Sequence, residues 1–241
     1  MRDVTIIFPY YENATMFERQ QRHIMSLPAA IREHLHVSVC DDCSIDHASE
    51  HVLADFAASV SSFQLFRVLE KRRWNWLTCR NICWHHCKTE WAIHTDIDHT
   101  IPADTLRWMM GDDLDADKVY FPFLRQDMPD LTHNPKHHPN TWFHTKAMYD
   151  KIGGYDERFS GNYGTDSDFR FRAEQASGGF VAVDKYITRW PREIVLDASC
   201  PDSFGRKNQD DKERVKSIKA ERELIPGWRP LRLTFPYERV I

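Results

Sequence analysis

The sequence predicts an α/β fold in which a mostly parallel central sheet is flanked by helices in a single domain. Short apolar runs of strand length recur along the first half of the chain, and segments of helical character separate them. Such alternation is typical of a parallel sheet covered on both faces. The 241 residues are enough for one domain with a sizeable core.

The first half of the chain contains the clearest elements. Strands are expected at residues 4–8 (VTIIF), 36–40 (HVSVC), 63–69 (FQLFRVL) and 90–95 (EWAIHT). Helices are expected between them, at residues 14–26, 46–60 and 78–88. Asn13 or Thr15 is a suitable cap for the first helix and Asp46 for the second, because their side chains accept hydrogen bonds from free backbone N–H groups.

The second half follows a looser pattern. Further helices are expected at residues 102–111, 145–152, 166–177 and 205–224, and further strands at 118–124 and 180–188. Glycine pairs at 153–154 and 178–179 provide the left-handed caps that end two of these helices. Residues 126–140 are expected to form a polar loop rich in Pro, His and Asn.

Composition excludes several classes of protein. The net charge of −4 and the isoelectric point near 6.3 argue against a broad basic face for non-specific nucleic-acid binding. No apolar run approaches the roughly 20 residues that a membrane span requires. The N-terminus has only a five-residue apolar stretch before Pro9, which indicates a buried strand rather than a signal peptide. A cytoplasmic protein without a transmembrane segment is therefore expected.

Three of the six cysteines, Cys79, Cys83 and Cys87, recur every four residues and so share one face of a helix. His85 and His86 lie among them, which raises the question of a zinc site. A tetrahedral zinc site usually draws its ligands from two separate elements. Small buried thiols on the sheet-facing side of the helix are therefore the favoured interpretation.

Acidic pairs follow two of the predicted strands. Asp41-Asp42 ends the second strand, and Asp96-Ile97-Asp98 ends the fourth. Because the carboxyl ends of parallel strands meet at one edge of a sheet, both pairs are expected to converge there. Carboxylates at positions i and i+2 of an extended segment point the same way and can share a divalent cation with phosphate oxygens. A solvated turn is the alternative interpretation of the second pair.

Four segments in order resemble glycosyltransferases of family 2. They are VTIIFPYYEN, VSVCDDCSID, RNICWHHCKTEWAIHTDID and IGGYDERFSGNYGTDSDFRFR, and they span roughly residues 4–172. The fourth segment is similar to the acceptor-side motif of galactosyltransferase and chondroitin-synthase-like members. The resemblance implies the Rossmann-like GT-A fold and a nucleotide-sugar substrate, usually a UDP-sugar. It divides the single domain 1–241 into a nucleotide-sugar-binding half (1–110), an acceptor-binding half (111–200) and a C-terminal helix and tail (201–241).

The resemblance also implies roles for residues that contact the nucleotide sugar. Asp41 would accept a hydrogen bond from the uracil ring, and Asp42 would support the turn. The other implied contacts are Pro9, Tyr10 and Glu12 beside the nucleoside, and Arg80 and Asn81 in the nucleotide pocket. Lys71, Arg72 and Arg73 follow the third strand and could assist departure of the diphosphate, but a charge run is more often a solvated surface.

By the same resemblance, Asp96 and Asp98 would bind Mn²⁺ or Mg²⁺, with Asp98 the more direct ligand. Many relatives supply a further histidine ligand well downstream of the base, whereas this chain has no histidine after His144. The cation could then be held by Asp98, the diphosphate and water, or by Asp197 or His99 in addition.

The acceptor side would be formed by the fourth segment. Asp166 takes the position of the general base, where the family often has Glu-Asp in place of Thr165-Asp166, and Asp168 would orient the acceptor or cap the helix. An N-cap role for Asp166 is the alternative. Further contacts are expected from Trp142 as a stacking platform on a mobile loop, His144, Gly154 and Tyr163. A core position for His144 and a metal site among the histidines of 133–144 are the alternatives.

The sequence thus predicts an inverting transfer of a sugar to an acceptor hydroxyl on a glycan, a lipid carrier, a protein or a small molecule. The same chemistry on a hydroxymethylated base in DNA is one alternative, because residues 206–222 are rich in Lys and Arg. A non-catalytic nucleotide-sugar-binding protein is another, although the acidic positions are intact. A nucleotidyltransferase would need a glycine-rich loop after the first strand, and PYYENATMFERQ has no glycine.

Overall fold

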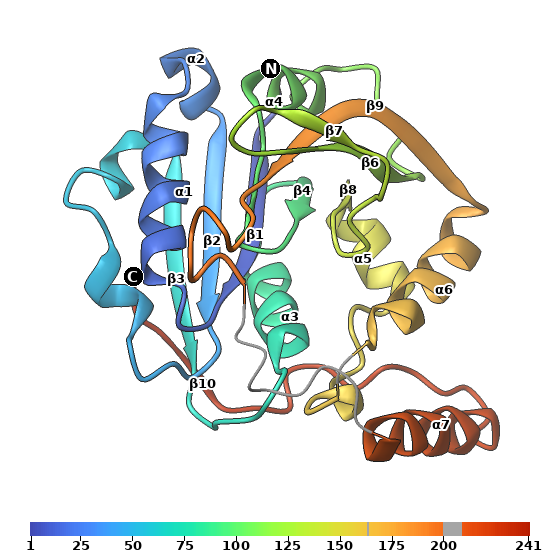
Figure 1. The fold of residues 1–241 in the computed structure, drawn as a ribbon. Helices are drawn as coiled ribbons and strands as arrows, with labels where there is room; N and C mark the ends of the chain where they lie inside the picture. The colour runs from blue at the N-terminus through green and yellow to red at the C-terminus, as the bar shows by residue number, and fades with distance from the viewer. Residues whose placement is uncertain (163, 200–208) are drawn as a thin grey trace.

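The computed structural model describes residues 1–162, 164–199 and 209–241. Within them one mixed sheet forms the centre of the molecule (Figure 1), with strand order β10-β3-β2-β1-β4-β8-β6-β9-β5 and β7 paired to β6. Its strands are β1 (Val4–Tyr10), β2 (Leu35–Asp41), β3 (Ser62–Val68), β4 (Trp91–His94), β5 (His99–Thr100), β6 (Val119–Asp127), β7 (Thr132–Asn134), β8 (Trp142–Thr145), β9 (Phe180–Arg189) and β10 (Tyr237–Arg239).

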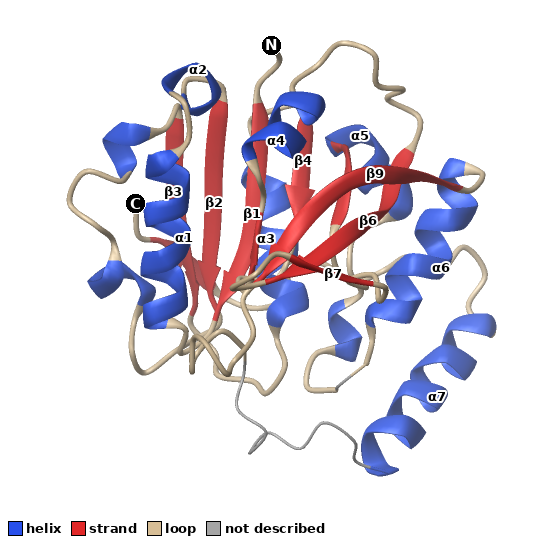
Figure 2. Cartoon of the chain, turned by 45° about the horizontal axis from the view of Figure 1, so that its top comes forward, coloured by secondary structure: helices blue, strands red, loops and turns tan. Residues whose placement is uncertain are grey.

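The helices lie on both sides of this sheet (Figure 2). They are α1 (Ala14–Ser26), α2 (Ala29–Arg32), α3 (Trp76–His86), α4 (Ala103–Met109), α5 (Lys146–Ile152), α6 (Asp166–Ser177) and α7 (Gln209–Glu223). Short 3₁₀ turns in the described ranges occur at Ala48–His51, Ala57–Ser59 and Glu157–Phe159. In the part of the chain that is described, no helix has the length and apolar character needed to cross a membrane.

The predicted α/β architecture is confirmed. β3, β2, β1 and β4 are neighbours and run parallel, and β6 and β9 run in the same direction across the antiparallel strand β8. The short strand β10 returns antiparallel to β3 and closes that edge. Six of the ten strands therefore point the same way and present their carboxyl ends at one edge.

Two apolar layers enclose the sheet, and β1 contributes to both because successive side chains of a strand point to opposite faces. Ile6 and Phe8 pack with Phe17 of α1 on one face, whereas Ile7 packs with Cys83 of α3 on the other. All of these side chains are essentially buried. The burial of both faces explains why the strand sequences are continuous apolar runs rather than alternating ones.

The cysteines of α3 are core residues, as expected. Cys79, Cys83 and Cys87 are buried free thiols in the layer behind β1 and β2. Burial raises the pKa of the Cys83 thiol, so it stays protonated at neutral pH. These thiols fill space against the sheet.

One predicted element is wrong. Residues 46–60 do not form a helix but a loop with two 3₁₀ turns. Side chains from neighbouring strand ends take the backbone N–H groups at the start of this segment: Glu12 accepts from Ile45 and Asp46, and Asp41 accepts from Ala48. These tertiary hydrogen bonds fix a turn where local propensity alone favours a helix.

Two other boundaries differ from expectation. The predicted polar loop 126–140 contains β7, which pairs with the end of β6, and residues 142–144, expected to end the mobile loop 133–144, belong to strand β8. The expected helices at 145–152 and 166–177 are α5 and α6. They end at Gly153 and Gly178, whose φ angles of 89° and 68° are left-handed.

Candidate active site

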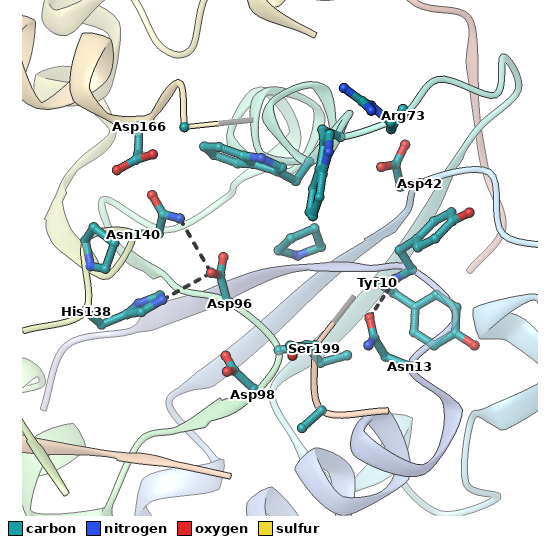
Figure 3. A pocket seen from close by; sticks show the side chains of 18 of the residues that line it. Tyr10, Asn13, Asp42, Arg73, Asp96, Asp98, His138, Asn140, Asp166 and Ser199 are labelled. Atoms are coloured by element: carbon teal, nitrogen blue, oxygen red, sulfur yellow. Dashed lines mark hydrogen bonds and ion pairs between the residues drawn. The ribbon is translucent and has the colours of Figure 1, made fainter. Parts of the chain in front are cut away.

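A cavity of about 550 Å³ opens beyond the carboxyl ends of β1, β2 and β4, where the N-terminus of α6 faces them (Figure 3). This is the place at which open α/β sheets bind ligands. The cavity is lined by Pro9, Tyr10, Tyr11, Asn13, Asp42, Arg72, Arg73, Trp74, Trp76, Asp96, Ile97, Asp98, His138, Pro139, Asn140, Gly164, Asp166, Ala198 and Ser199.

Six of the predicted site residues therefore share one cavity: Pro9, Tyr10, Asp42, Asp96, Asp98 and Asp166. They come from four separate segments of the chain. In Figure 3, His138 and Asn140 lie along the edge of the cavity between Asp166 and Asp98. The predicted convergence of the acidic turns at one edge of the sheet is present in the structure.

Asp96 is held by a buried arginine beneath the cavity floor. The Arg80 side chain is 0% exposed, and its Nη2 lies 2.5 Å from Asp96 Oδ1 while its Nη1 donates to the Tyr155 hydroxyl at 3.0 Å. Burial pushes the pKa of Asp96 upward, but the positive charge of Arg80 and the hydrogen bond with His138 outweigh it and hold that pKa below its ordinary value. Arg80 does not line the cavity; it neutralises Asp96 from behind.

Asp98 stands in a different environment, beside two histidines. His99 Nδ1 lies 2.6 Å from Asp98 Oδ1, and the rings of His99 and His138 are 3.9 Å apart between centroids. His138 Nε2 also lies 3.1 Å from Asp96 Oδ2. Ligand atoms of Asp98, His99 and His138 all lie within 4.8 Å of one another. Within residues 1–162, 164–199 and 209–241, no other three His, Cys, Asp or Glu side chains bring their ligand atoms this close together.

This cluster fits a divalent cation such as Mn²⁺ or Mg²⁺. A carboxylate oxygen and two imidazole nitrogens are a donor set that first-row divalent metals accept, with Mn²⁺ more tolerant of nitrogen than Mg²⁺. His99 Nε2 is buried and has no hydrogen-bond partner among the described residues, which leaves it available. Burial, reinforced by His99, lowers the pKa of His138 and so keeps its ring in the neutral form that binds metals.

The two aspartates at the end of β2 have the reverse of the expected arrangement. Asp41 is buried and accepts hydrogen bonds from the backbone N–H groups of Ser44 (2.8 Å) and Ala48 (2.9 Å), so it holds the turn. Asp42 lines the cavity, where its Oδ2 accepts from the backbone N–H of Asn75. The expectation that Asp41 faces the nucleoside and Asp42 supports the turn is therefore corrected.

Two other residues expected at the nucleotide serve the framework instead. Glu12, with φ of 52°, accepts hydrogen bonds from Ile45 and Asp46 and so ties the ends of β1 and β2 together. Asn81 is buried; its amide donates to the Tyr155 carbonyl and to Glu157. Neither of them lines the cavity.

The two aspartates of α6 are also in different environments. Asp166 lies in the first turn of the helix and lines the cavity, while Thr165 is the N-cap residue. Asp168 is buried and binds Arg172 through two nitrogens, at 3.0 and 2.9 Å, and also Arg222 of α7. Asp168 therefore connects α6 to α7 and does not face the cavity, which corrects its expected contact with an acceptor.

The expected acceptor contacts beyond Asp166 are not on the cavity wall. Trp142 is 1% exposed in β8, where its ring stacks on Phe121 at 3.9 Å, and His144 is fully buried against Trp84. Both sequence-based roles are corrected, because the strand β8 turns these side chains into the core. Gly154 packs against Asn81 and Arg232 away from the cavity, and Tyr163 lies outside the described residues.

Sequence reasoning missed several residues of the cavity wall. Arg72 and Arg73 line it, contrary to the preference for a solvated surface, and Arg73 also pairs with Asp211 of α7 at 2.7 Å. Trp74 and Trp76, just after these arginines, also line the cavity. Two tryptophans beside a run of cations were the feature of the sequence that could have indicated a binding surface here. His138 was considered only as one of the histidines of 133–144 that could form a metal site, and Asn140 was not singled out.

Asp197, an alternative cation ligand by sequence, has another task. Its carboxylate accepts hydrogen bonds from the backbone N–H groups of Thr15 (2.6 Å) and Met16 (3.0 Å) at the start of α1. Asn13, the N-cap residue of that helix, makes no side-chain capping bond itself. A distant aspartate thus supplies the cap that local sequence assigned to Asn13 or Thr15.

Comparisons with known proteins place the fold. No protein-family model matches the sequence, and no curated protein matches it. Among solved structures, residues 1–349 of TarS from S. aureus in complex with UDP-GlcNAc align with a TM-score of 0.62 and 16% identity, over 91% of this chain and 66% of that one.

Two further structures align over most of the chain. Mannosyltransferase PcManGT from Pyrobaculum calidifontis, in complex with GDP-Man and Mn²⁺, gives a TM-score of 0.55 and 20% identity, over 78% of this chain and 57% of that one. GalNAc-T7 with UDP, GalNAc and Mn²⁺ gives a TM-score of 0.62 and 12% identity, over 90% of this chain and 48% of that one. The chain spans between 48% and 66% of the length of these three proteins. At these identities the likeness concerns architecture, and the chain has the GT-A fold.

Proposed function

We propose that this protein is a glycosyltransferase that moves a sugar from a nucleoside-diphosphate donor, a UDP-sugar in first place, to an acceptor hydroxyl with inversion. One observation carries the proposal: the carboxylate–histidine cluster at Asp98 and the carboxylate of Asp166 border the same cavity. The structural neighbours in complex with UDP-GlcNAc, GDP-Man or UDP support a nucleotide sugar as the ligand.

The nucleotide would lie against the half of the cavity formed by residues 1–110. Asp42 offers a carboxyl group whose Oδ1 is buried and has no hydrogen-bond partner in the described chain. Pro9 and Tyr10 form the adjoining wall, and the Tyr10 side chain is fixed by its hydroxyl, which donates to the Asp46 carbonyl at 2.8 Å. Arg72 and Arg73 carry the positive charge that a diphosphate requires.

Asp98, His99 and His138 would hold a divalent cation, Mn²⁺ or Mg²⁺, which when bound stabilises the negative charge of the departing diphosphate. Mn²⁺ is preferred to Mg²⁺ because two of the three ligands are imidazoles, and because Mn²⁺ is present in the PcManGT and GalNAc-T7 structures. Asp96 is a weaker ligand in this proposal, because Arg80 already neutralises it. Its role is to position His138, to which it is joined by the 3.1 Å contact.

Asp166 is proposed as the general base. It would take the proton of the acceptor hydroxyl while that oxygen forms a bond to the anomeric carbon and the bond from that carbon to the diphosphate breaks. Inversion follows because attack comes from the face opposite the leaving group. Residues 111–200 supply this side of the cavity through His138, Asn140 and Asp166.

The proposal is tested with a panel of nucleotide sugars, by measuring release of free nucleoside diphosphate with Mn²⁺ and with EDTA. We expect turnover with at least one UDP-sugar, its loss in EDTA, and its loss in Asp98→Ala. Asp184→Ala is the matched control, because the Asp184 side chain is 90% exposed on β9 and lies outside the cavity wall. Full activity of Asp98→Ala would contradict the proposal.

A further inference from the structure

A second groove of about 880 Å³ lies beside the cavity, over the ends of β6, β7 and β9. It is lined by Arg125, Asp127, Thr132, His133, Asn134, Pro135, Lys136 and Arg189. The strand register brings these side chains together, because Arg125 pairs with Asn134 of β7 and Asp127 pairs with Arg189 of β9. Nothing in the proposed chemistry uses this groove.

The groove has more positive than negative charge. Three cations, Arg125, Lys136 and Arg189, face a single carboxylate, that of Asp127. Asp127 lies 3.6 Å from Arg125 Nε and 3.6 Å from Arg189 Nη1, which is too long for hydrogen bonds, and its Oδ2 accepts from Asn134 at 2.7 Å. One carboxylate engaged in this way leaves much of the donor capacity of two guanidinium groups unused.

Arg125 is the most buried of these three cations. It is 9% exposed, and its Nε is buried without a hydrogen-bond partner among the described residues. Burial lowers the pKa of Arg125, and the charge of Arg189 lowers it further, while Asp127 and Asp98 raise it. A buried guanidinium whose Nε–H has no acceptor is costly unless an anion completes its hydrogen bonds.

The groove adjoins the cation cluster of the cavity. Arg189 pairs with His99 in the β5–β9 register, and the next residue, Trp190, donates its backbone N–H to the Asp98 carbonyl at 2.8 Å. Lys136 lines the groove, and His138, two residues later, lines the cavity. The groove and the cavity are therefore adjacent on the side where Asp98 and His138 lie.

We propose that this groove binds a phosphate group carried by the acceptor, with Arg125 and Arg189 as its main ligands and Lys136 at its rim. The assignment of that molecule as the acceptor rests on the proposed function; binding of the phosphate itself does not. Paired guanidinium groups suit a phosphate because each can donate two parallel hydrogen bonds. A short phosphorylated acceptor suits the groove better than nucleic acid, because its cations are confined to one spot and the chain is acidic overall.

The test is equilibrium binding of glycerol 1-phosphate to the full chain, followed by shifts in the ¹H–¹⁵N spectrum and compared with uncharged glycerol. We expect shifts of the amide signals of residues 125–127, 132–134, 136 and 189, and no binding of glycerol. Arg189→Gln and Lys136→Gln should weaken binding, the first about tenfold, as expected for the loss of a charged hydrogen bond. Arg107→Gln, an arginine 52% exposed on α4, is the matched control and should bind as wild type.

Several outcomes would overturn the assignment: equal affinity in wild type and both groove variants, shifts confined to the cavity, or a duplex oligonucleotide binding more tightly than the phosphorylated probe at equal phosphate concentration. Lys136 is exposed, so its variant keeps the test valid if Arg189→Gln fails to fold. The measurement needs no nucleotide sugar and no turnover. A wild-type chain that releases no nucleoside diphosphate, yet binds the probe here, would remove the proposed function and leave the phosphate site standing.

Discussion

Asp41 holds a turn and Asp42 faces the cavity. Isosteric substitutions of these two neighbouring residues should therefore affect different properties, stability in one case and nucleotide binding in the other. Asp41→Asn removes the charge that accepts hydrogen bonds from Ser44 and Ala48, both in buried surroundings. Asp42→Asn changes a group that accepts a hydrogen bond from Asn75 alone among the described hydrogen bonds and otherwise faces the cavity. The first should reduce stability, and the second should weaken binding of the nucleotide.

The magnitudes follow from these contacts. Asp41→Asn weakens two charge-assisted hydrogen bonds, because one of the two backbone N–H donors now faces the side-chain N–H₂ group instead of a carboxylate oxygen. We expect the free energy of unfolding to fall by about 3 kcal/mol. Burial raises the pKa of Asp42 well above its ordinary value, so the folded chain holds this proton more strongly than the unfolded chain. The favourable contribution of Asp42 is thus present at pH below about 4 and is lost as the pH rises toward the folded-state value. Asp42→Asn should therefore equal wild type in acid and match or exceed its stability at pH 8.

Urea unfolding below pH 4 and at pH 8 measures the stabilities, and calorimetry with UDP measures nucleotide binding. We expect Asp42→Asn to weaken UDP binding about tenfold, the value of one lost hydrogen bond to a buried group. Asp41→Asn should bind UDP normally wherever it remains folded. The reasoning fails if Asp41→Asn is as stable as wild type and loses UDP binding, while Asp42→Asn binds UDP unchanged.

Three other predictions follow from the site. Arg80→Met should lower the free energy of unfolding by about 2 kcal/mol in urea titrations, below the cost of breaking a fully buried pair because Asp96 is 36% exposed; an unchanged midpoint would contradict this. His138→Ala should weaken Mn²⁺ binding at least about tenfold by electron paramagnetic resonance, since it removes one ligand, and equal affinity would exclude His138 from the cation site. Asp168→Asn should free α7, seen as faster amide exchange there, because Arg222 loses its carboxylate; unchanged exchange would show that α7 is held elsewhere.

Much of the fold could be predicted from the sequence because its signals are local. The apolar runs of β1 and β2 bury both faces of each strand, and the glycines after α5 and α6 adopt the left-handed conformation that ends a helix. The convergence of Asp42, Asp96 and Asp98 followed from strand direction alone. These features depend on the types of residues and on their spacing along the chain, both of which can be seen in a single sequence.

The remainder depends on contacts between distant segments. The loop after β2 is not a helix because Glu12, far away in sequence, takes its backbone N–H groups. Trp142 and His144 are core residues because β8 inserts between β4 and β6, a pairing that a polar, proline-rich neighbourhood conceals. Which aspartate of the pair Asp41-Asp42 faces the cavity depends on the geometry of one turn.

In the proposed function, Asp98 helps to hold the cation that binds the nucleotide sugar on one side of the cavity, and Asp166 acts as the base for the acceptor on the other side. Calorimetry and turnover with the best nucleotide sugar and Mn²⁺, in Asp98→Ala and Asp166→Asn, test it most directly. We predict that Asp98→Ala loses both turnover and affinity for the nucleotide sugar, whereas Asp166→Asn binds it normally and loses turnover. Wild-type turnover in Asp166→Asn would contradict the claim.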